Sequence, residues 1–227
     1  MTNILDFPAT VLVAKTVPKN AFYKRAKPQR INALKQFLTD AFENITWLYK
    51  LHPNTLKIAT GEQVQEIDVF HCLVKTAKID PTLLLEIDAL IPRHTLFVLQ
   101  YPDRTDVVMQ LKTVTSSFVS CSAHIETLAA EELKNKPLCI RGQDMDSVYA
   151  YLLGQVSGLH TTTETAYLSA SALRKELNNL HKQLVALQNK IRNEKQFNLQ
   201  VTMNTQAKQL KNLITEQEQK LTKIVSV

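Results

Sequence analysis

The chain has 227 residues, of which 44% are apolar and 21% charged, and its net charge is +6. This composition is typical of a folded protein and argues against a disordered one, and the length suits one or two domains. No apolar run approaches the ~20 residues of a membrane-spanning helix, because the longest, Leu83 to Ile91, contains Glu86 and Asp88. We therefore expect a cytoplasmic protein with no membrane partner. The four glycines form no phosphate-binding cluster, which argues against an ATPase or a dinucleotide enzyme.

The N-terminal part of the chain predicts a helix followed by three strands. Alternating apolar residues up to position 14 indicate a short strand, and a helix is expected to begin near Pro28, because proline is tolerated in a first turn. β-Branched and aromatic residues then predict strands over residues 45–51, 56–58 and 64–74, separated by turns.

The middle of the chain predicts a second helix and the centre of a sheet. Asp80 before Pro81 is a capping residue followed by a favoured first helical residue. The continuous apolar run of residues 95–101 is typical of a central strand covered on both faces. Further elements are strands over 107–111 and 114–121 and a helix over 144–159. Together these elements predict an α+β domain of residues 1–160, with a mixed β-sheet and flanking helices.

The last third of the chain carries an apolar seam. Six residues follow at alternating steps of four and three, the repeat of a coiled coil: Leu173, Leu177, Leu180, Leu184, Leu187 and Ile191. This register fails near Glu194. A second register then follows, with polar interruptions at Gln206 and Gln217: Leu199, Met203, Leu210, Leu213 and Leu221. We expect residues 161–227 to form a long helical hairpin or coiled coil, with arms over 164–194 and 199–224. One continuous bent helix is the alternative, because the connection contains no Gly or Pro.

The seam is the candidate surface for binding a protein partner. A narrow apolar stripe on an otherwise polar helix must pack against another helix. The neighbour is the second arm, a partner protein or a second copy of the chain.

Basic residues concentrate at the two ends of the chain. The net charge is +6 over residues 1–60, −5 over 61–163 and +5 over 164–227. Trp47 and Tyr49 lie among the N-terminal cations, and exposed aromatics beside cations suit base stacking and phosphate contact. The alternative is that these aromatics belong to the core and the charges only solvate the surface. The candidate nucleic-acid-binding residues are Lys24, Arg25, Lys27, Arg30 and Lys50.

Two carboxylates, Glu66 and Asp68, lie two residues apart on one face of the predicted strand 64–74. The expected element order of residues 28–101 is similar to that of PD-(D/E)xK nucleases. Those enzymes bind Mg²⁺ with strand carboxylates and place a lysine two residues after the last one. Phe70 occupies that position here, and the preceding strand supplies no acid. A nuclease would use Glu66 and Asp68 with Mg²⁺ as its cofactor; the other interpretations are a polar strand edge and a degenerate, inactive core.

No Cys and His residues have the spacing of a zinc site. Outside the nuclease alternative we therefore expect no metal and no cofactor.

Four segments resemble a bacterial family known as a domain of unknown function, DUF4391. They are ITWLYKLHPNTLKI at 45–58, QEIDVF at 65–70, IDALIPRHTLFVL at 87–99 and KIRNEKQFNLQV at 190–201. The resemblance implies proteins encoded beside DNA methyltransferases and helicases in restriction-like or phage-defence clusters. It therefore implies a methyltransferase or helicase subunit as partner, and it supplies no catalytic residues.

The leading functional hypothesis is a non-enzymatic accessory or scaffold subunit of a bacterial DNA-modification or phage-defence complex. Its helical hairpin would bind a partner protein, and its basic ends would face nucleic acid. Two alternatives stay open at this point: a divergent metal-dependent nuclease of the PD-(D/E)xK type, and a self-assembling coiled-coil dimer with no nucleic-acid role.

Overall fold

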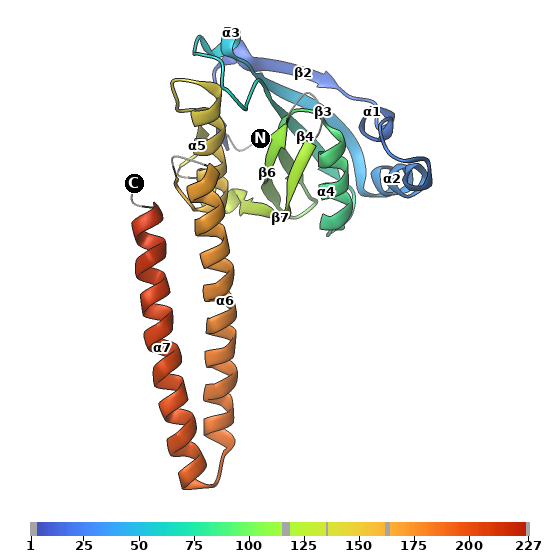
Figure 1. Cartoon of the computed structure of the whole chain (residues 1–227). Helices are drawn as coiled ribbons and strands as arrows, with labels where there is room; N and C mark the ends of the chain where they lie inside the picture. Colours follow the sequence, from blue (N-terminus) through green and yellow to red (C-terminus); the bar gives the residue numbers. More distant parts are fainter. Residues whose placement is uncertain (1–3, 115–118, 135, 162–163, 226–227) are drawn as a thin grey trace. The chain divides into compact units, whose positions relative to one another are not determined.

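A mixed sheet of six strands is the centre of the first of two compact units, which comprise residues 1–158 and 159–227. The computed structural model describes residues 4–114, 119–134, 136–161 and 164–225. The strands follow the spatial order of their numbers (Figure 1). Neighbours β4 and β5 run parallel and the other neighbours antiparallel. The strands are β2 (Leu12–Thr16), β3 (Phe42–Leu51), β4 (Ile67–Val74), β5 (His94–Gln100), β6 (Thr105–Val114) and β7 (Val119–Ala129). The predicted α+β class with a mixed sheet is confirmed.

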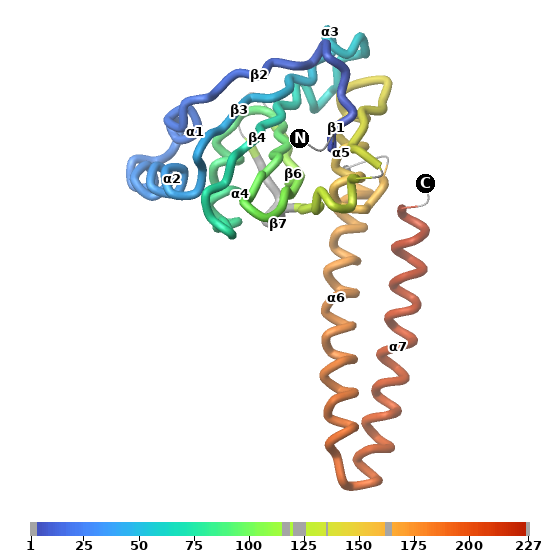
Figure 2. The backbone as a smooth tube through the Cα atoms, turned by 180° about the vertical axis from the view of Figure 1, so that it is seen from behind, coloured from blue at the N-terminus to red at the C-terminus, as the bar shows by residue number. Residues whose placement is uncertain are grey.

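Helices flank this sheet, as the sequence predicts. Three of them contribute to the main core: α1 (Asn20–Tyr23), α2 (Pro28–Ala41) and α4 (Pro81–Leu90). Their buried side chains, such as Leu34 and Ile87, pack with Phe70 of β4 and Phe97 of β5. Helix α5 (Met145–Ser157) packs against β6 and β7, away from α1, α2 and α4 (Figures 1 and 2).

Short elements complete the first unit. Strand β1 (Leu5–Asp6) pairs in parallel with β8 (Leu138–Cys139) in a second, two-stranded sheet. Two 3₁₀ helices cover Ala9–Val11 and Ala130–Leu133. The strand predicted over residues 114–121 lies partly outside the described residues, and β7 begins at Val119.

Asp80 begins α4 as its sequence predicts. The Thr82 backbone N–H donates a hydrogen bond of 2.8 Å to the Asp80 carboxylate, and Pro81 occupies the first turn. The helix ends before Pro92, and β5 begins two residues later. The chain thus crosses from β4 to its parallel neighbour β5 through α4, the usual connection between parallel strands.

The predicted strand over residues 56–58 is wrong, because residues Pro53–Leu56 form the short helix α3. The Asn54 backbone N–H donates to Nδ1 of His52 (3.2 Å), and the His52 N–H donates to the Thr55 hydroxyl (3.3 Å). These reciprocal bonds satisfy the free donors of a first helical turn. Only two strands, β3 and β4, therefore lie between α2 and α4. The predicted similarity to the nuclease core required three strands at this place, so the element order matches less well than expected.

The strand predicted from residue 64 begins only at Ile67, because the preceding N–H groups bind a distant carboxylate. Asp146 of α5 accepts from the backbone N–H groups of Glu62 (2.7 Å), Gln63 (3.1 Å) and Val64 (2.7 Å). These donors are therefore not available to a strand ladder. One side chain ties the loop before β4 to the first turn of α5.

The second unit is a hairpin of two helices, α6 (Glu164–Asn193) and α7 (Phe197–Val225), which run in opposite directions (Figure 1). The predicted hairpin is confirmed, and the single bent helix is wrong. Glu194 makes the turn without glycine or proline. Its carboxylate accepts from the backbone N–H groups of Lys195 (2.8 Å) and Gln196 (2.9 Å), and its carbonyl accepts from the Gln200 side chain (2.9 Å).

Candidate functional site

A cavity of about 360 Å³ lies in the first unit, where β3 and β4 meet α1 and the loop between α4 and β5. We call it the Asp68 cavity. Its walls are mainly apolar and aromatic, with one carboxylate and three cationic side chains among them. The lining residues include Phe22, Lys24, Arg25, Trp47, Asp68, Phe70, Ile91, Pro92 and Arg93.

Strand pairing brings these residues together from distant parts of the sequence. Trp47 of β3 lies opposite Phe70 of β4, and Lys50 lies opposite Asp68. On the other side of β4, Ile67 pairs with His94, the first residue of β5. The preceding residue, Arg93, therefore reaches the start of β4, where the two predicted carboxylates lie.

Arg93 and Lys50 neutralise the two carboxylates. The Arg93 guanidinium donates to Asp68 Oδ2 at 2.8 Å and lies 3.3 Å from Glu66 Oε1. Lys50 Nζ lies 2.7 Å from Glu66 Oε2. The side chain of Asp68 is 2% exposed, whereas that of Arg93 is 46% exposed. The chain's own cations thus hold the two acids at one side of the cavity.

Burial sets the protonation of Asp68. Desolvation raises the pKa of Asp68 to about 6; nearby Arg93 opposes this shift and the Glu66 carboxylate adds to it. The carboxyl is therefore mostly ionised at neutral pH, and its pKa lies only a little below neutrality. Within the described part of the chain, its second oxygen, Oδ1, has no hydrogen-bond partner.

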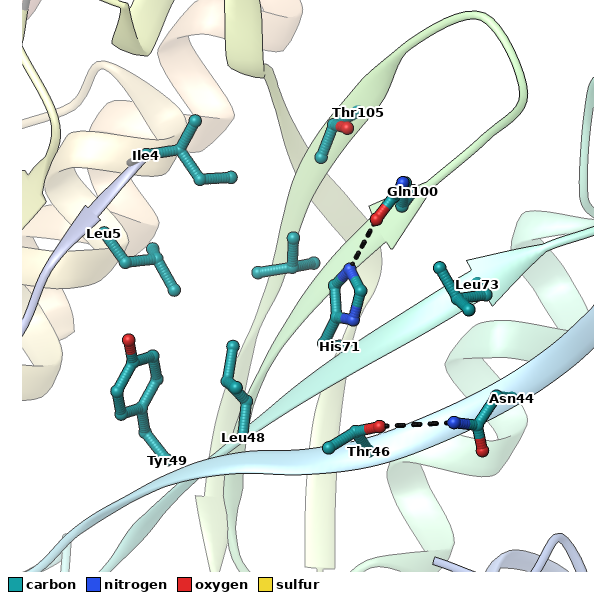
Figure 3. Close-up of a pocket in the computed structure, with 11 residues that line it drawn as sticks. Ile4, Leu5, Asn44, Thr46, Leu48, Tyr49, His71, Leu73, Gln100 and Thr105 are labelled. Atoms are coloured by element: carbon teal, nitrogen blue, oxygen red, sulfur yellow. Dashed lines mark hydrogen bonds between the residues drawn. The ribbon is translucent and has the colours of Figure 1, made fainter. Parts of the chain in front are cut away.

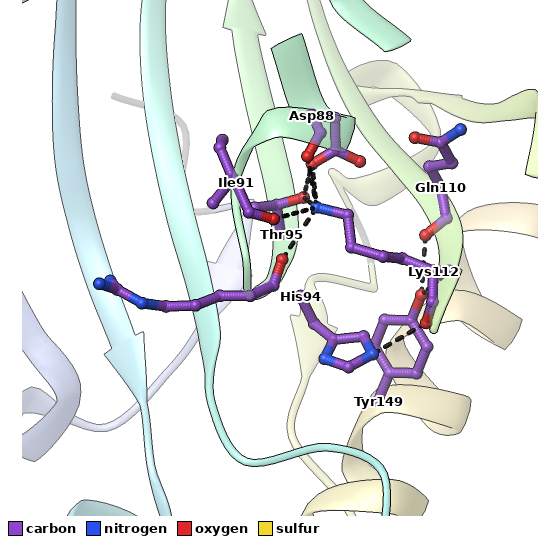
Figure 4. A network of polar contacts seen from close by, with 8 residues as sticks. Asp88, Ile91, His94, Thr95, Gln110, Lys112 and Tyr149 are labelled. Carbon is purple, nitrogen blue, oxygen red and sulfur yellow. Dashed lines mark hydrogen bonds and ion pairs between the residues drawn. The ribbon is translucent and has the colours of Figure 1, made fainter. Parts of the chain in front are cut away.

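A buried lysine fixes the loop that carries Arg93 (Figure 4). Lys112 Nζ donates to the carbonyl oxygens of Asp88 (2.7 Å), Ile91 (3.3 Å) and Arg93 (2.8 Å). It also bonds the Asp88 carboxylate at 2.6 Å. The ammonium thus bonds both the last turn of α4, where the Asp88 carbonyl also accepts from the Ile91 N–H (3.0 Å), and the residues that follow the helix. It thereby fixes the backbone from which Arg93 extends toward Asp68.

The five predicted nucleic-acid-binding residues fall into two groups. Lys24 and Arg25 are exposed and line the Asp68 cavity, and Lys27 is exposed just before α2. Arg30 instead pairs with Glu86 at 2.6 Å. Lys50 pairs with Glu66 and lies 5.8 Å from the centre of the Trp47 ring.

Trp47 is both a core residue and a cavity residue. Its half-buried ring packs against the main core, as the alternative interpretation expects, and also lines the Asp68 cavity. Its Nε1 donor is buried without a partner among the residues described. A buried unpaired N–H is uncommon in proteins, so this donor is a candidate for a bond to a ligand.

The carboxylate pair does not form a recognisable metal centre. Glu66 and Asp68 lie together, as their spacing predicts, but both bind cations of the chain. Across the described ranges, no three His, Cys, Asp or Glu residues gather in a way that could hold an ion. The position of the nuclease lysine is filled by buried Phe70.

A second hollow, of about 520 Å³, opens beside β3, β4 and β5 (Figure 3). His71 and Gln100 line it as a hydrogen-bonded pair, with 2.9 Å between Nε2 and Oε1, and Asn44 donates to Thr46 at 3.5 Å. None of its lining residues is Asp, Glu, Lys or Arg. It therefore lacks the carboxylate and the cations that the Asp68 cavity has, and the Asp68 cavity is the stronger candidate.

Helix α7 covers the predicted leucine seam. Leu177 and Leu180 are buried against Ile214, and Leu184, Leu210 and Leu221 pack against this cluster. The remaining seam residues, Leu173, Leu187 and Ile191, are half-buried. A partner bound at the seam would have to share these side chains with α7.

The second arm follows the predicted register only in part: Leu210, Gln217 and Leu221 lie on the seam, and other predicted positions do not. Leu199 and Leu213 are exposed, by 44% and 37%. The positions that face α6 include Ala207, Ile214 and Gln217, all buried. Leu213 and Ile214 follow Leu210 at steps of three and four, so the sequence allows an apolar stripe through either residue. The stripe through Ile214 forms the interface with α6.

Arg93 and Lys112 are the residues of this site that the sequence did not reveal. Arg93 follows Pro92 in a loop, and only the parallel pairing of β4 with β5 shows that it meets Asp68. Lys112 stands one residue beyond a predicted strand, and nothing in its sequence neighbours indicates that it is buried. The usable signal was the β4–α4–β5 crossover, which places the residue before β5 beside the start of β4.

The sequence profile of a family described as Domain of unknown function (DUF4391) matches residues 5–214. No curated protein and no solved structure matches the chain. In the parts of the chain that the structure describes, no helix has the length and apolar character needed to span a bilayer.

Proposed function

Because the chain belongs to the DUF4391 family, whose description names no activity, we propose its function from geometry: a non-enzymatic, nucleic-acid-binding accessory subunit. The observation that carries the proposal is the joint placement of Lys24, Arg25 and Trp47 around one cavity. These residues come from two separate segments, and the fold gathers them. Cations supply phosphate affinity and aromatic walls supply contact with bases.

Charge supports this assignment of the surface. Residues 1–60 carry a net charge of +6. Lys24 and Arg25 have no carboxylate at ion-pair distance within the described ranges, so their charge is available to a polyanion. Arg30 and Lys50 contribute less, because each is partly neutralised by a glutamate.

The absence of catalysis in this proposal rests on the carboxylates. A metal-dependent nuclease needs acids whose oxygens can bind the ion. Asp68 and Glu66 instead bind Arg93 and Lys50. No feature of the described residues favours the nuclease over a binding protein.

We assign contact with a protein partner to the hairpin. The leucine seam already packs on α7, so the partner would meet other apolar side chains near the turn. The most exposed of these is Phe197, at 75%, followed by Val201 at 49%. The family resemblance suggests a DNA methyltransferase or helicase subunit of a phage-defence complex, in the cytoplasm.

The test measures binding of labelled single-stranded and duplex DNA by fluorescence anisotropy, at about 50 and about 200 mM salt. We expect binding that weakens steeply with salt. The Lys24→Ala/Arg25→Ala variant should weaken it and reduce the salt slope by up to about 2, since two phosphate contacts are removed.

The matched control is Lys78→Ala/Lys136→Ala, which removes the same charge from exposed positions that do not line the cavity. It should leave the salt slope of binding nearly unchanged. The proposal fails if the unaltered chain binds no nucleic acid at the lower salt concentration, or if the control loses as much affinity as the cavity variant.

A further inference from the structure

Two residues that line the Asp68 cavity each carry a buried polar atom without a partner in the described structure. Asp68 Oδ1 and Trp47 Nε1 are both buried, and neither has a hydrogen-bond partner among the described residues. A buried polar atom without a partner is unfavourable, so proteins seldom keep one. Both residues line the same cavity. A ligand that supplies one N–H and one acceptor would satisfy both atoms.

We propose that the Asp68 cavity receives a single unstacked nucleobase from a bound strand of nucleic acid. This inference rests on the proposed function and names the part of the nucleic acid that the cavity recognises. It predicts a preference for single strands over duplex, because a paired base cannot present its edge to Asp68.

The volume and walls of the cavity fit one base. About 360 Å³ lies near the lower end of small-ligand sites, which range from ~300 to ~1,000 Å³. Phe22, Trp47, Phe70, Ile91 and Pro92 supply flat or apolar surface for the faces of the ring. Such surface tolerates any base, since every base has a π face.

The polar atoms fit the edge of a base. Asp68 Oδ1 would accept a hydrogen bond from a ring N–H or an exocyclic amino group. Trp47 Nε1–H would donate to a ring nitrogen or a carbonyl oxygen. The Watson–Crick edge of each base carries at least one donor and one acceptor. Arg93 donates to the other oxygen of this carboxylate, Oδ2, and not to Oδ1.

The mouth of the cavity fits the backbone of the strand. Lys24 and Arg25 line the cavity and are exposed to solvent. A base inserted between these cations and Asp68 would leave its flanking phosphates beside them. The combination of a buried acceptor and exposed cations suits a nucleotide, whose base carries donors and whose phosphate is anionic. A simple anion would meet the Asp68 carboxylate and be repelled.

The experiment uses the full chain and a short oligonucleotide with one 2-aminopurine, a fluorescent base that keeps an amino group. We expect binding to change its fluorescence in the single strand but not in the matching duplex. Replacement of all bases by abasic sites should weaken binding at least about tenfold, while the phosphates remain.

Two cavity variants and one control separate the contacts. Asp68→Asn and Trp47→Phe should each weaken single-strand binding about three- to tenfold and leave duplex binding unchanged. His71→Gln, which alters the second hollow instead, should bind like the unaltered chain. Thermal melting of each variant shows whether it is folded, and either cavity variant alone suffices for the test.

The outcomes distinguish this inference from the proposed function. If no nucleic acid binds at low salt, both fail. If DNA binds but abasic strands, Asp68→Asn and Trp47→Phe all bind as tightly as their references, only the nucleobase inference is overturned. Equal affinity for duplex and single strand, with no fluorescence change, would also overturn it.

Discussion

The ammonium of Lys112 lies 2.6 Å from the carboxylate of Asp88, and both side chains are at least 98% buried. Thr95 also donates its hydroxyl proton to this carboxylate. Burial raises the pKa of Asp88, and the nearby ammonium opposes that shift. The pair joins β6 to the end of α4, so a charge inside the protein fixes the loop that aims Arg93 at Asp68.

Removal of Lys112 should strongly destabilise the first unit. Lys112→Met leaves a buried carboxylate and three carbonyl groups without their cation, and we expect a loss of about 3–5 kcal/mol in the free energy of unfolding. The measurement is urea denaturation followed by circular dichroism. Lys112→Met/Asp88→Leu should recover part of the loss, because it also removes the stranded charge. Equal or greater loss in the double variant would contradict the prediction.

Asp68 and His94 should give the stability of the protein opposite pH dependences. Burial lowers the pKa of His94 to about 4, although its hydrogen bond to the Lys112 carbonyl opposes the shift. Its contribution is complete above pH 6.5 and is lost as pH falls through 4. Asp68, whose pKa is raised to about 6, contributes fully below pH 3.8 and loses that contribution as pH rises through 6.

The two groups should give opposite slopes of unfolding free energy against pH, and these slopes partly cancel in the unaltered chain between pH 4 and 6. Single variants should therefore reveal each slope. Asp68→Asn removes the aspartate effect, so its stability should rise more steeply with pH than that of the unaltered chain. His94→Gln removes the histidine effect, so its stability should shift in the opposite sense, toward a fall with pH. Each effect amounts to at most about 3 kcal/mol. Urea midpoints measured in steps from pH 4 to 7 test this; parallel curves for both variants would disprove it.

Gly61 should tolerate no side chain. A Cβ at this position would lie 2.7 Å from Asp146 Cγ and 2.7 Å from the Val64 carbonyl oxygen. Gly61→Ala would displace the carboxylate from the three N–H groups it binds, and we expect a loss of about 2–3 kcal/mol. Gly158→Ala is the comparison: it has a φ of +71° and open space around it, so it should cost only about 1 kcal/mol. Thermal melting of the two variants should show the larger decrease for Gly61→Ala.

Gln217 should limit the stability of the hairpin. It is 9% exposed in the seam near Ile214, and its Oε1 is buried without a partner in the described structure. Gln217→Leu should stabilise the second unit by about 1–2 kcal/mol, because it replaces a desolvated amide with apolar surface. Calorimetry of the full chain measures this. Gln219→Leu, at an exposed position, should change stability by less than about 0.5 kcal/mol.

The sequence predicted the elements whose signals are local. Asp80 and Pro81 marked the start of α4, and the leucine steps from Leu173 marked an arm of the hairpin. The segment 56–58 was misread, because its apolar alternation is a weaker signal than the capping by His52 and Thr55. Local patterns report on neighbours in the chain, and these were sufficient for the fold class.

The candidate site was only half predictable, because its geometry depends on pairing between distant segments. The types and positions of Glu66, Asp68, Lys24 and Arg25 stood out in the sequence. That Arg93 would neutralise the acids required knowledge that β4 and β5 are parallel neighbours. The choice between Leu213 and Ile214 likewise depended on how α7 rotates against α6.

The hydrogen bonds that Asp146 accepts from the loop before β4 also have a consequence for biosynthesis. Glu62 and its acceptor are 84 residues apart in the chain. While the ribosome is still translating that interval, the amides before β4 have no native acceptor, and long-range closure of this kind slows folding. The loop before β4 can therefore reach its final conformation only after α5 has left the exit tunnel.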